Sequence, residues 1–344
     1  IRLDRNSPSR SVANLGNAAL GLIVDNIVRV QHGAAPRSLP AQPDGVICSA
    51  KVTSIQAARF LSQRLIATRR QRNDRLQWSV ATIAPTLDAA SARWYTPPLN
   101  VDIADPFPVW VDGQLYVFVE LFDLNVGRGQ IAVFSDVTRR GWSDPEVVLE
   151  QPFHLSFPLV FTHQGEWFML PEQSESGGVS LYRATRFPRE WSLEREILVG
   201  FPGLDTMILQ HEGRWWLFST NRSGSNVDNN LHVFHSPSFD GVFEPLDANP
   251  VKACLGSSRM AGHFFKHNGQ LVRPAQNGLR TYGGGVVLNR VDHLSRDDYR
   301  ETEIDQLAPF VTPYLEGFHT INRAGAVTLI DGVRRLPGQG ARWV

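Results

Sequence analysis

The stretch Asp112-Gly113-Gln-Leu-Tyr-Val-Phe-Val-Glu120 decides the fold, because its pattern of a turn glycine followed by a strand-like run returns four more times. The other copies lie at residues 164–172, 212–220, 268–276 and 324–332. Their glycines, at positions 113, 165, 213, 269 and 325, are 52, 48, 56 and 56 residues apart. A recurring period of this kind is typical of an architecture built from repeated units.

Each of the first four units contains the sequence for a four-stranded sheet. An apolar run precedes the glycine, a second run follows it, and third runs appear at 131–134, 179–182, 231–234 and 286–289. Closing segments follow, such as 142–149 and 191–198. The Asp-Gly and Asn-Gly pairs favour tight hairpin turns, because these residues adopt positive φ angles readily. Five such units predict an all-β protein, a five-bladed β-propeller.

A β-sandwich with irregular hairpins is the competing fold, but its strands would not repeat the same order in four successive units. The fifth unit is short after Gly332, so we expect a strand from the N-terminal region to complete it and close the ring. The propeller is therefore placed at residues 100–344. Residues 1–99 are predicted to form a smaller N-terminal α/β segment that packs on the propeller or completes it.

This N-terminal segment contains a strand-like run at residues 45–52 and an amphipathic helix at residues 54–75. Apolar residues recur along the helix at helical spacing, and arginines occupy the remaining face. A solvated surface accounts for the basic face, and partner binding is the alternative.

Composition and charge exclude several classes of function. Lys plus Arg and Asp plus Glu both number 34, with no long run of either sign, which argues against a nucleic-acid or anionic-membrane surface. The apolar stretch 18–30 is too short and too often interrupted to span a membrane. Without a signal-peptide pattern a cytoplasmic protein is favoured, although a chain that starts at Ile1 leaves a removed leader or an upstream domain open. Cys48 and Cys254 are interpreted as free thiols.

The repeat register selects candidate site residues, because the innermost strands of a propeller converge on its axis. Seven residues after the glycine stand Glu120, Glu172, Thr220, Gln276 and Gly332, and eight before it stand Asp105, Phe157, Asp205, Ala261 and Gly317. Cleavage of a glycosidic bond needs two carboxyl groups in opposite protonation states. Asp105, Glu172 and Asp205 are therefore the catalytic candidates. Strand or turn capping is the alternative for each, and for Glu120 the two interpretations are balanced.

Polar and aromatic residues near these positions are of the types that bind sugars. The substrate-binding candidates are Glu120, His154, Arg259, His263, Arg273, Gln276 and Tyr282. The alternative for Arg259 or Arg273 is that it neutralises the acidic cluster. No metal site is predicted, because His263 and His267 would lie about 13 Å apart along a strand. The run Gly283-Gly-Gly285 lacks the lysine and helix of a phosphate loop, so no cofactor is predicted either.

Several ordered motifs, taken together, resemble a known family. The motifs are Ala104-Asp-Pro-Phe-Pro108, His154-Leu-Ser-Phe-Pro158, Met169-Leu-Pro-Glu172, Arg259-Met-Ala-Gly262 and Arg273-Pro-Ala-Gln276. They look like the propeller domain named for the N-terminal region of plant glucosamine inositolphosphorylceramide transferase, over roughly residues 78–303. More distantly, the five blades and the Ala-Asp-Pro opening are similar to glycoside hydrolase families 43, 32 and 68. This resemblance implies a carbohydrate-handling propeller and matches Asp105 to the first-blade catalytic aspartate of those hydrolases. The Glu-Gly-Pro or Glu-Cys-Pro context of their acid is absent, so Glu172 is assigned from the repeat register alone.

These observations lead to two main hypotheses. The first is an enzyme that cleaves or transfers a glycosidic bond in a bacterial polysaccharide or glycoconjugate, with Asp105 as base or nucleophile, Glu172 as acid and Asp205 orienting or tuning its neighbour. The alternative is a non-catalytic module that binds a glycan for a partner enzyme, as expected if another domain carries the catalysis. A protein-binding propeller is a third interpretation, which the polar residues at the axis disfavour.

Overall fold

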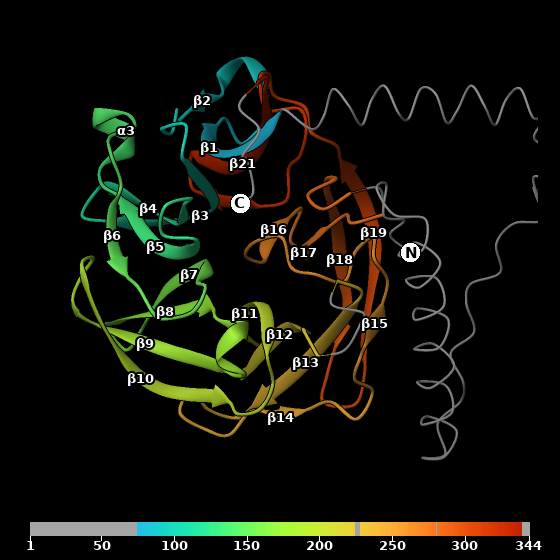
Figure 1. The fold of residues 1–344 in the computed structure, drawn as a ribbon. Coiled ribbons are helices and arrows are strands. Elements are labelled where there is room, and N and C mark those ends of the chain that lie inside the picture. Colours follow the sequence, from blue (N-terminus) through green and yellow to red (C-terminus); the bar gives the residue numbers. More distant parts are fainter. Residues whose placement is uncertain (1–73, 224–227, 280, 339–344) are drawn as a thin grey trace, which may run out of the picture. The chain divides into compact units, whose positions relative to one another are not determined.

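The computed structural model describes residues 74–223, 228–279 and 281–338. Residues Leu76–Arg334 form one compact unit, in which five sheets surround a common centre (Figure 1). The predicted all-β, five-bladed propeller is confirmed. The strand expected at 45–52 and Cys48 fall outside the described residues. So does the helix expected at 54–75, apart from its last two positions, and Arg75 begins a strand.

The first sheet is formed by β3 (Val101–Val111), β4 (Gln114–Asp123), β5 (Arg128–Phe134) and β6 (Glu146–Leu149). The second contains β7 (Ser156–His163), β8 (Glu166–Glu172), β9 (Val179–Arg186) and β10 (Glu190–Leu198). The third contains β11 (Gly203–His211), β12 (Arg214–Asn221), β13 (Asn230–Ser236) and β14 (Glu244–Pro245), and β15 (Lys252–Ala253) also pairs with β13.

The fourth sheet contains β16 (Phe265–His267), β17 (Gln270–Gln276), β18 (Val286–Leu294) and β19 (Tyr299–Leu307). The fifth combines the two ends of the described chain: β20 (Ile321–Ala324) and β21 (Val327–Leu336) pair with β1 (Arg75–Ile83) and β2 (Arg93–Trp94). The ring is therefore closed within one sheet by strands from both ends. The described helices are the short segments η1 (Ala89–Ser91), α3 (Val137–Arg140) and η2 (Ser174–Ser176), and among the described residues no helix is long and apolar enough to cross a membrane.

The hairpin turns next to the axis adopt the backbone that their sequence predicts. Asp112, Gln164, Glu212 and Asn268 have φ angles of 50°, 51°, 49° and 50°, and each is followed by a glycine with positive φ. Two successive residues with positive φ match the right-handed twist of the flanking strands. The turn glycines therefore mark the hairpin between the first and second strand of each of these sheets.

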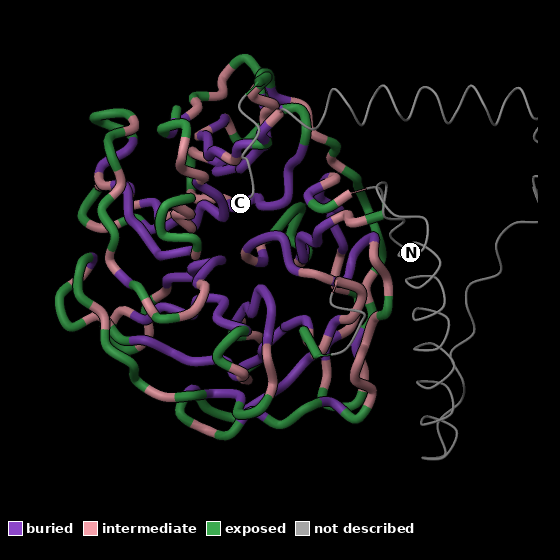
Figure 2. The backbone as a smooth tube through the Cα atoms, viewed as in Figure 1, coloured by how far each residue is buried: buried purple, intermediate pink, exposed green. Residues whose placement is uncertain are grey.

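The core lies between neighbouring sheets, because alternate residues of a strand point to opposite faces. In β4, Val117 and Val119 belong to an apolar cluster with Val80 and Leu329 of the fifth sheet. Phe118, between them, instead belongs to the cluster that includes residues of the second sheet. Figure 2 shows the same alternation, with buried backbone along the inner strands and exposed backbone at the outer loops. This packing on both faces holds the inner strands rigidly around the axis.

The inner strands of the first three sheets share an irregularity at one register position. Asp105, Phe157 and Asp205 have φ angles of 52°, 47° and 48°, and the strand pairing shifts at each of them. A left-handed backbone costs an L-residue about 1–2 kcal/mol, and a bulge re-aims the side chain that it carries. The repeat therefore builds three equivalent bends beside the axis, two of which carry an aspartate.

Candidate functional site

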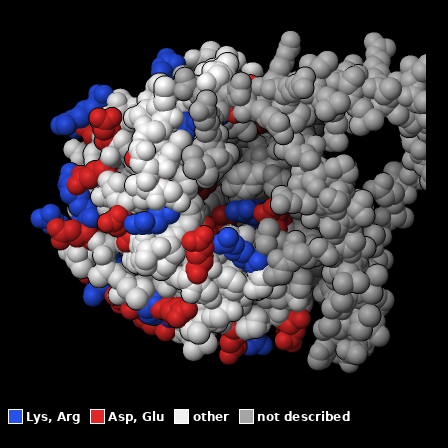
Figure 3. Space-filling view, in the orientation of Figure 1, with Lys and Arg blue, Asp and Glu red and all other residues white. Residues whose placement is uncertain are grey.

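A cavity of about 530 Å³ opens at the axis and is lined by residues from all five sheets and their connections. Seven of the ten residues predicted from the sequence line it: Asp105, Glu120, His154, Glu172, Asp205, Arg259 and Tyr282. His263, Arg273 and Gln276 do not. Acidic and basic side chains lie next to one another near the centre of the face seen in Figure 3. The repeat register therefore brings together residues that are far apart in sequence.

Asp105 is almost fully buried at the bend of β3. Its Oδ1 accepts a hydrogen bond from the Thr320 hydroxyl at 2.7 Å, and its Oδ2 accepts one from the Phe157 backbone N–H at 3.2 Å. Burial raises the pKa of Asp105 to about 7, against the opposing charge of His319 and with further contributions from nearby carboxylates. Asp105 is thus a carboxyl group that exchanges its proton near neutral pH.

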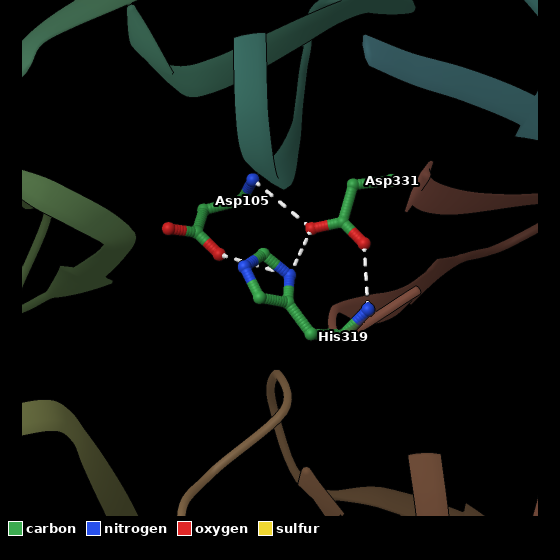
Figure 4. Close-up of side chains that lie close together, drawn as sticks. All are labelled: Asp105, His319 and Asp331. Carbon is green, nitrogen blue, oxygen red and sulfur yellow. Dashed lines mark hydrogen bonds and ion pairs between the residues drawn. The ribbon is translucent and has the colours of Figure 1, made fainter. Parts of the chain in front are cut away.

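His319 and Asp331 lie beside Asp105 and were not predicted from the sequence (Figure 4). The Asp331 carboxylate lies 2.5 Å from His319 Nδ1 and accepts hydrogen bonds from the backbone N–H groups of His319, Thr320 and Asp105 at 2.9, 3.0 and 3.4 Å. Burial lowers the pKa of His319, but the carboxylates of Asp331 and Asp105 raise it by more, to about 9. The ring is therefore charged at neutral pH.

Asp105, His319 and Asp331 each offer one ligand atom for a metal ion, and these atoms lie within 4.8 Å of one another. However, a separation of 2.5 Å between His319 Nδ1 and Asp331 Oδ2 is that of a charge-assisted hydrogen bond with a proton between the two atoms. Four N–H groups already occupy the Asp331 oxygens. In this arrangement the His319 and Asp331 side chains share a proton, and Asp105 is linked to them through its own backbone N–H and through the Thr320 hydroxyl.

Asp205, at the equivalent bend of β11, meets a permanent cation instead. Arg259 donates from Nε to Asp205 Oδ2 at 2.6 Å and from Nη2 to Oδ1 at 3.2 Å, and Gln276 Nε2 donates to Oδ2 at 2.8 Å. The remaining arm of Arg259 donates to Asp228 at 2.8 Å. Burial raises the pKa of Asp205, and the guanidinium group opposes this shift. Gln276 therefore acts on the cavity indirectly, by orienting Asp205.

Glu172 accepts two hydrogen bonds at the end of β8. The Ser156 hydroxyl donates to its Oε2 and the Ser174 backbone N–H to its Oε1, both at 2.7 Å. Hydrogen bonds donated to both carboxylate oxygens stabilise the ionised form. Glu172 is therefore held in one orientation by donors to both of its oxygens.

Glu120 and His154 form a second carboxylate and imidazole pair at the wall of the cavity. The Gly129 backbone N–H donates to His154 Nδ1 at 2.9 Å, and His154 Nε2 lies 3.2 Å from Glu120 Oε1. Burial lowers the pKa of His154 and Glu120 raises it by more. The Gly129 N–H requires a lone pair on Nδ1, so this contact opposes the effect of Glu120 and places the proton of the neutral ring on Nε2.

Besides Gln276, the predicted binding residues His263 and Arg273 lie outside the cavity. The His263 backbone N–H donates to Asn322 at 2.7 Å, and the ring Nδ1 lies 2.6 Å from the Phe264 carbonyl oxygen. Arg273 is fully buried and pairs with Glu301 at 2.6 Å. It also donates to the carbonyl oxygens of Ser257 and Ser258 at 2.5 and 3.1 Å. Arg273 thus holds the loop that carries Arg259, rather than facing a ligand.

The lining of the cavity combines acidic and aromatic side chains. Seven carboxyl groups face two guanidinium groups: Asp102, Asp105, Glu120, Glu172, Glu175, Asp205 and Asp228 against Arg222 and Arg259. Trp78, Phe122 and Tyr282 supply the aromatic part of the wall. The cavity can therefore hold a small polar ligand, preferably a positively charged one, against an aromatic surface.

Comparison with known sequences places these residues in a family. Residues 57–310 match the family model described as glucosamine inositolphosphorylceramide transferase 1, N-terminal. Glucosamine inositolphosphorylceramide transferase 1 of Arabidopsis thaliana is 34% identical over 240 residues, which cover 68% of this chain and 31% of the relative. The protein of that name from Oryza sativa subsp. japonica is 33% identical over 235 residues, covering 66% and 31%. The chain thus spans about a third of the length of these relatives.

Solved structures give weaker likenesses. Zg3597, a family 117 glycoside hydrolase produced by Zobellia galactanivorans, has a TM-score of 0.49 at 11% identity, covering 75% of this chain and 90% of that one. The exo-β-1,3-galactanase 1,3Gal43A from Clostridium thermocellum has a TM-score of 0.46 at 13% identity, covering 59% and 49%. At these values the likeness carries no argument about the reaction.

Proposed function

The chain belongs to the family of the N-terminal region of glucosamine inositolphosphorylceramide transferase 1, and from this premise we propose that it acts on a glycosidic bond of an amino-sugar glycoconjugate. The observation that carries the proposal is the axial cavity, where Asp105 and Glu172 stand in opposite electrostatic surroundings. Two carboxyl groups that differ in this way are the requirement for general acid and base chemistry at a glycosidic bond.

The size and charge of the cavity support a sugar as the ligand. Its volume of about 530 Å³ lies within the range of small-molecule sites, about 300–1,000 Å³. The excess of carboxyl groups attracts positive charge, and a sugar with a free amine is cationic at neutral pH. Glucosamine also appears in the name of the plant relatives. The Asp205–Arg259 pair offers both acceptors and donors for sugar hydroxyl groups at the far side of the cavity.

The hydrogen bonds support a division of roles between the two carboxyl groups. Asp105, with a pKa near 7, suits a proton donor, whereas Glu172 accepts from Ser156 and Ser174 and suits a base or nucleophile. This is the reverse of the roles suggested by the repeat register and by the resemblance to glycoside hydrolases. Asp205, fixed by Arg259, remains the residue that orients the ligand or tunes its neighbours.

The test is turnover of aryl β-glucosaminides, with the N-acetylated and the amine-free glucosides as comparisons. We expect the free amine to be preferred, and Asp105→Asn and Glu172→Gln each to lower kcat by about 10²–10⁴. Asp292→Asn, at an exposed carboxylate on β18, is the matched control and should retain full turnover. Full activity of the Asp105→Asn variant would contradict the proposal.

Glycan binding without catalysis is the second candidate function. It is favoured by the length of the plant relatives, since about two thirds of each lies outside the part that this chain matches. In that case glucosamine binding should persist in both Asp105→Asn and Glu172→Gln, and no aglycone should be released from any glycoside that binds.

A further inference from the structure

The ring of His319, a cavity residue, is held by three separate neighbours. Trp78 stacks on it, with ring centroids 4.1 Å apart and planes 22° apart. Tyr282 meets it edge-on at 5.2 Å and 89°. Asp331, on β21, fixes Nδ1 at 2.5 Å. The ring therefore cannot turn to exchange its two nitrogens without breaking contacts with all three neighbours.

The hydrogen bonds of Asp331 identify the proton on Nδ1. The other three groups that contact its carboxylate are backbone N–H donors, so Asp331 acts throughout as an acceptor and His319 Nδ1 must donate to it. Nε2 makes no hydrogen bond to any of the described residues, and His319 lines the cavity. Nδ1 is also the ring nitrogen that lies 3.9 Å from Asp105 Oδ1 (Figure 4). Nε2 is therefore the ring atom left to meet a ligand.

We propose that His319 Nε2 donates a hydrogen bond to an oxygen atom of the bound sugar, beside Asp105, and that Asp331 is the residue that positions the ring and its protons. The inference rests on the proposed glycan site and adds to it a residue in contact with the ligand. Asp331 does not line the cavity, so it acts through its neighbours, of which His319 is the one that its side chain contacts at 2.5 Å.

The charges around His319 favour the donor form of Nε2. Asp331 on β21, Asp105 on β3 and Asp205 on β11 all face the ring, and together they outweigh the effect of burial. Glu120 on β4 adds a further negative charge near Asp105. A doubly protonated ring keeps Nδ1–H on Asp331 and presents Nε2–H to the cavity.

The first experiment requires no ligand. In ¹⁵N-histidine NMR of the full chain, with the resonance assigned by His319→Gln, we expect His319 to carry protons on both nitrogens at pH 7. Its titration midpoint should lie near pH 9 and should fall by at least about two pH units in Asp331→Asn. Asp292→Asn should leave the midpoint unchanged. A His319 midpoint that does not respond to Asp331→Asn would overturn the role of Asp331.

The second experiment measures the contact itself with D-glucosamine as the probe, by isothermal titration calorimetry and by the His319 Nε2 resonance. We expect saturation to shift that resonance, and His319→Gln to weaken binding by at least about tenfold, as for loss of a charged hydrogen bond. His267→Gln, an exposed histidine on β16, is the control and should bind normally. Equal binding by wild type and His319→Gln would refute the contact and leave the glycan site standing. No binding by wild type would refute the glycan site, and the contact with it, while the ligand-free titration still decides the role of Asp331.

Discussion

Asp105 and Asp205 occupy the same place in two repeats but stand in opposite chemical surroundings. Each lies eight residues before its hairpin glycine, in an inner strand, with φ angles of 52° and 48°, and each is buried. Asp205 accepts a fork of hydrogen bonds from Arg259, a permanent cation. Asp105 faces His319, which can lose its charge, and a second carboxylate, Asp331.

The difference shows what a repeat provides and what it leaves to individual residues. The repeat provides the bend and the direction of the side chain, which are shared by Asp105, Phe157 and Asp205. The charge state comes from side chains of other sheets, which the repeat does not specify. A permanent cation opposes the rise that burial causes in the pKa of Asp205, whereas the partner of Asp105 is a histidine, which can itself lose its charge.

The largest expected effect is the pH dependence of the unfolding free energy that Asp105 causes. The pKa of Asp105 is raised from 3.8 to about 7, so between these pH values the folded protein binds a proton that the unfolded chain has lost. This contribution to stability is therefore fully present below pH 3.8 and is lost as the pH rises through 7. With about 1.4 kcal/mol per pH unit it amounts to about 4 kcal/mol. Asp105→Asn should reduce the fall in unfolding free energy over this range by about this amount, measured by urea denaturation at successive pH values.

His319 provides an internal reference for that measurement. Its pKa is raised from 6.5 to about 9, so its contribution has the same sign and is lost at higher pH, as the pH rises through 9. The Asp105→Asn variant should keep this second fall while showing a smaller first one. An unchanged slope between pH 4 and 7 would show that Asp105 is ionised in the folded protein and would remove the contrast with Asp205.

A smaller loss is expected from removing the permanent cation. Arg259→Gln leaves the Asp205 carboxylate, whose side chain is 3% exposed, without its charged partner. Breaking a buried pair in this way should lower the unfolding free energy by about 3 kcal/mol at pH 7. The deficit should shrink in acid, because protonated Asp205 needs no counter-charge. Chemical denaturation at pH 7 and pH 4 measures both effects.

The control for this variant is a pair with the same geometry at the surface. Arg290 Nε and Asp292 Oδ1 are 2.6 Å apart, the same distance as between Arg259 Nε and Asp205 Oδ2. In the surface pair, however, about a third of each side chain is exposed. Arg290→Gln should therefore cost less than about 1 kcal/mol. Equal losses in the two variants would mean that burial does not distinguish the two pairs.

The fold was predictable because a turn glycine and an alternating strand leave their pattern in each repeat, and five patterns at a regular spacing define five sheets. Four of the seven carboxyl groups of the cavity followed from the same register, and Asp102, Glu175 and Asp228 did not. His319 and Asp331 did not, because the register positions of the fifth unit are Gly317 and Gly332, one or two residues away. Their partner Asp105 is more than 200 residues distant, and only the closed ring brings them together.

Arg273 shows the opposite failure of the sequence pattern. It lies in an inner hairpin beside polar neighbours, and arginine usually occurs at a protein surface. Its guanidinium group is nevertheless fully buried against Glu301 and the carbonyl oxygens before Arg259. Which of the two arginines lines the cavity depends on depth along the axis, and period-two alternation does not encode depth. An arginine in this region was therefore predictable from the sequence, but whether it lines the cavity or supports the loop behind it was not.

The smallest expected effect isolates the backbone that Asp105 and Asp205 share. Glu212 adopts the same left-handed conformation at an exposed turn, with φ 49°, and its side chain is 79% exposed, so no site chemistry intervenes. Asparagine tolerates this region better than glutamate. Glu212→Asn should therefore raise the unfolding free energy by about 0.5 kcal/mol, and Asn268→Glu at the equivalent turn of the fourth sheet should lower it by a similar amount.

If thermal denaturation shows these opposite shifts, the conformational cost is common to both turns, and the contrast between the two buried aspartates belongs to their partners. A shift of the same sign in both variants would instead mean that each turn sets its own cost.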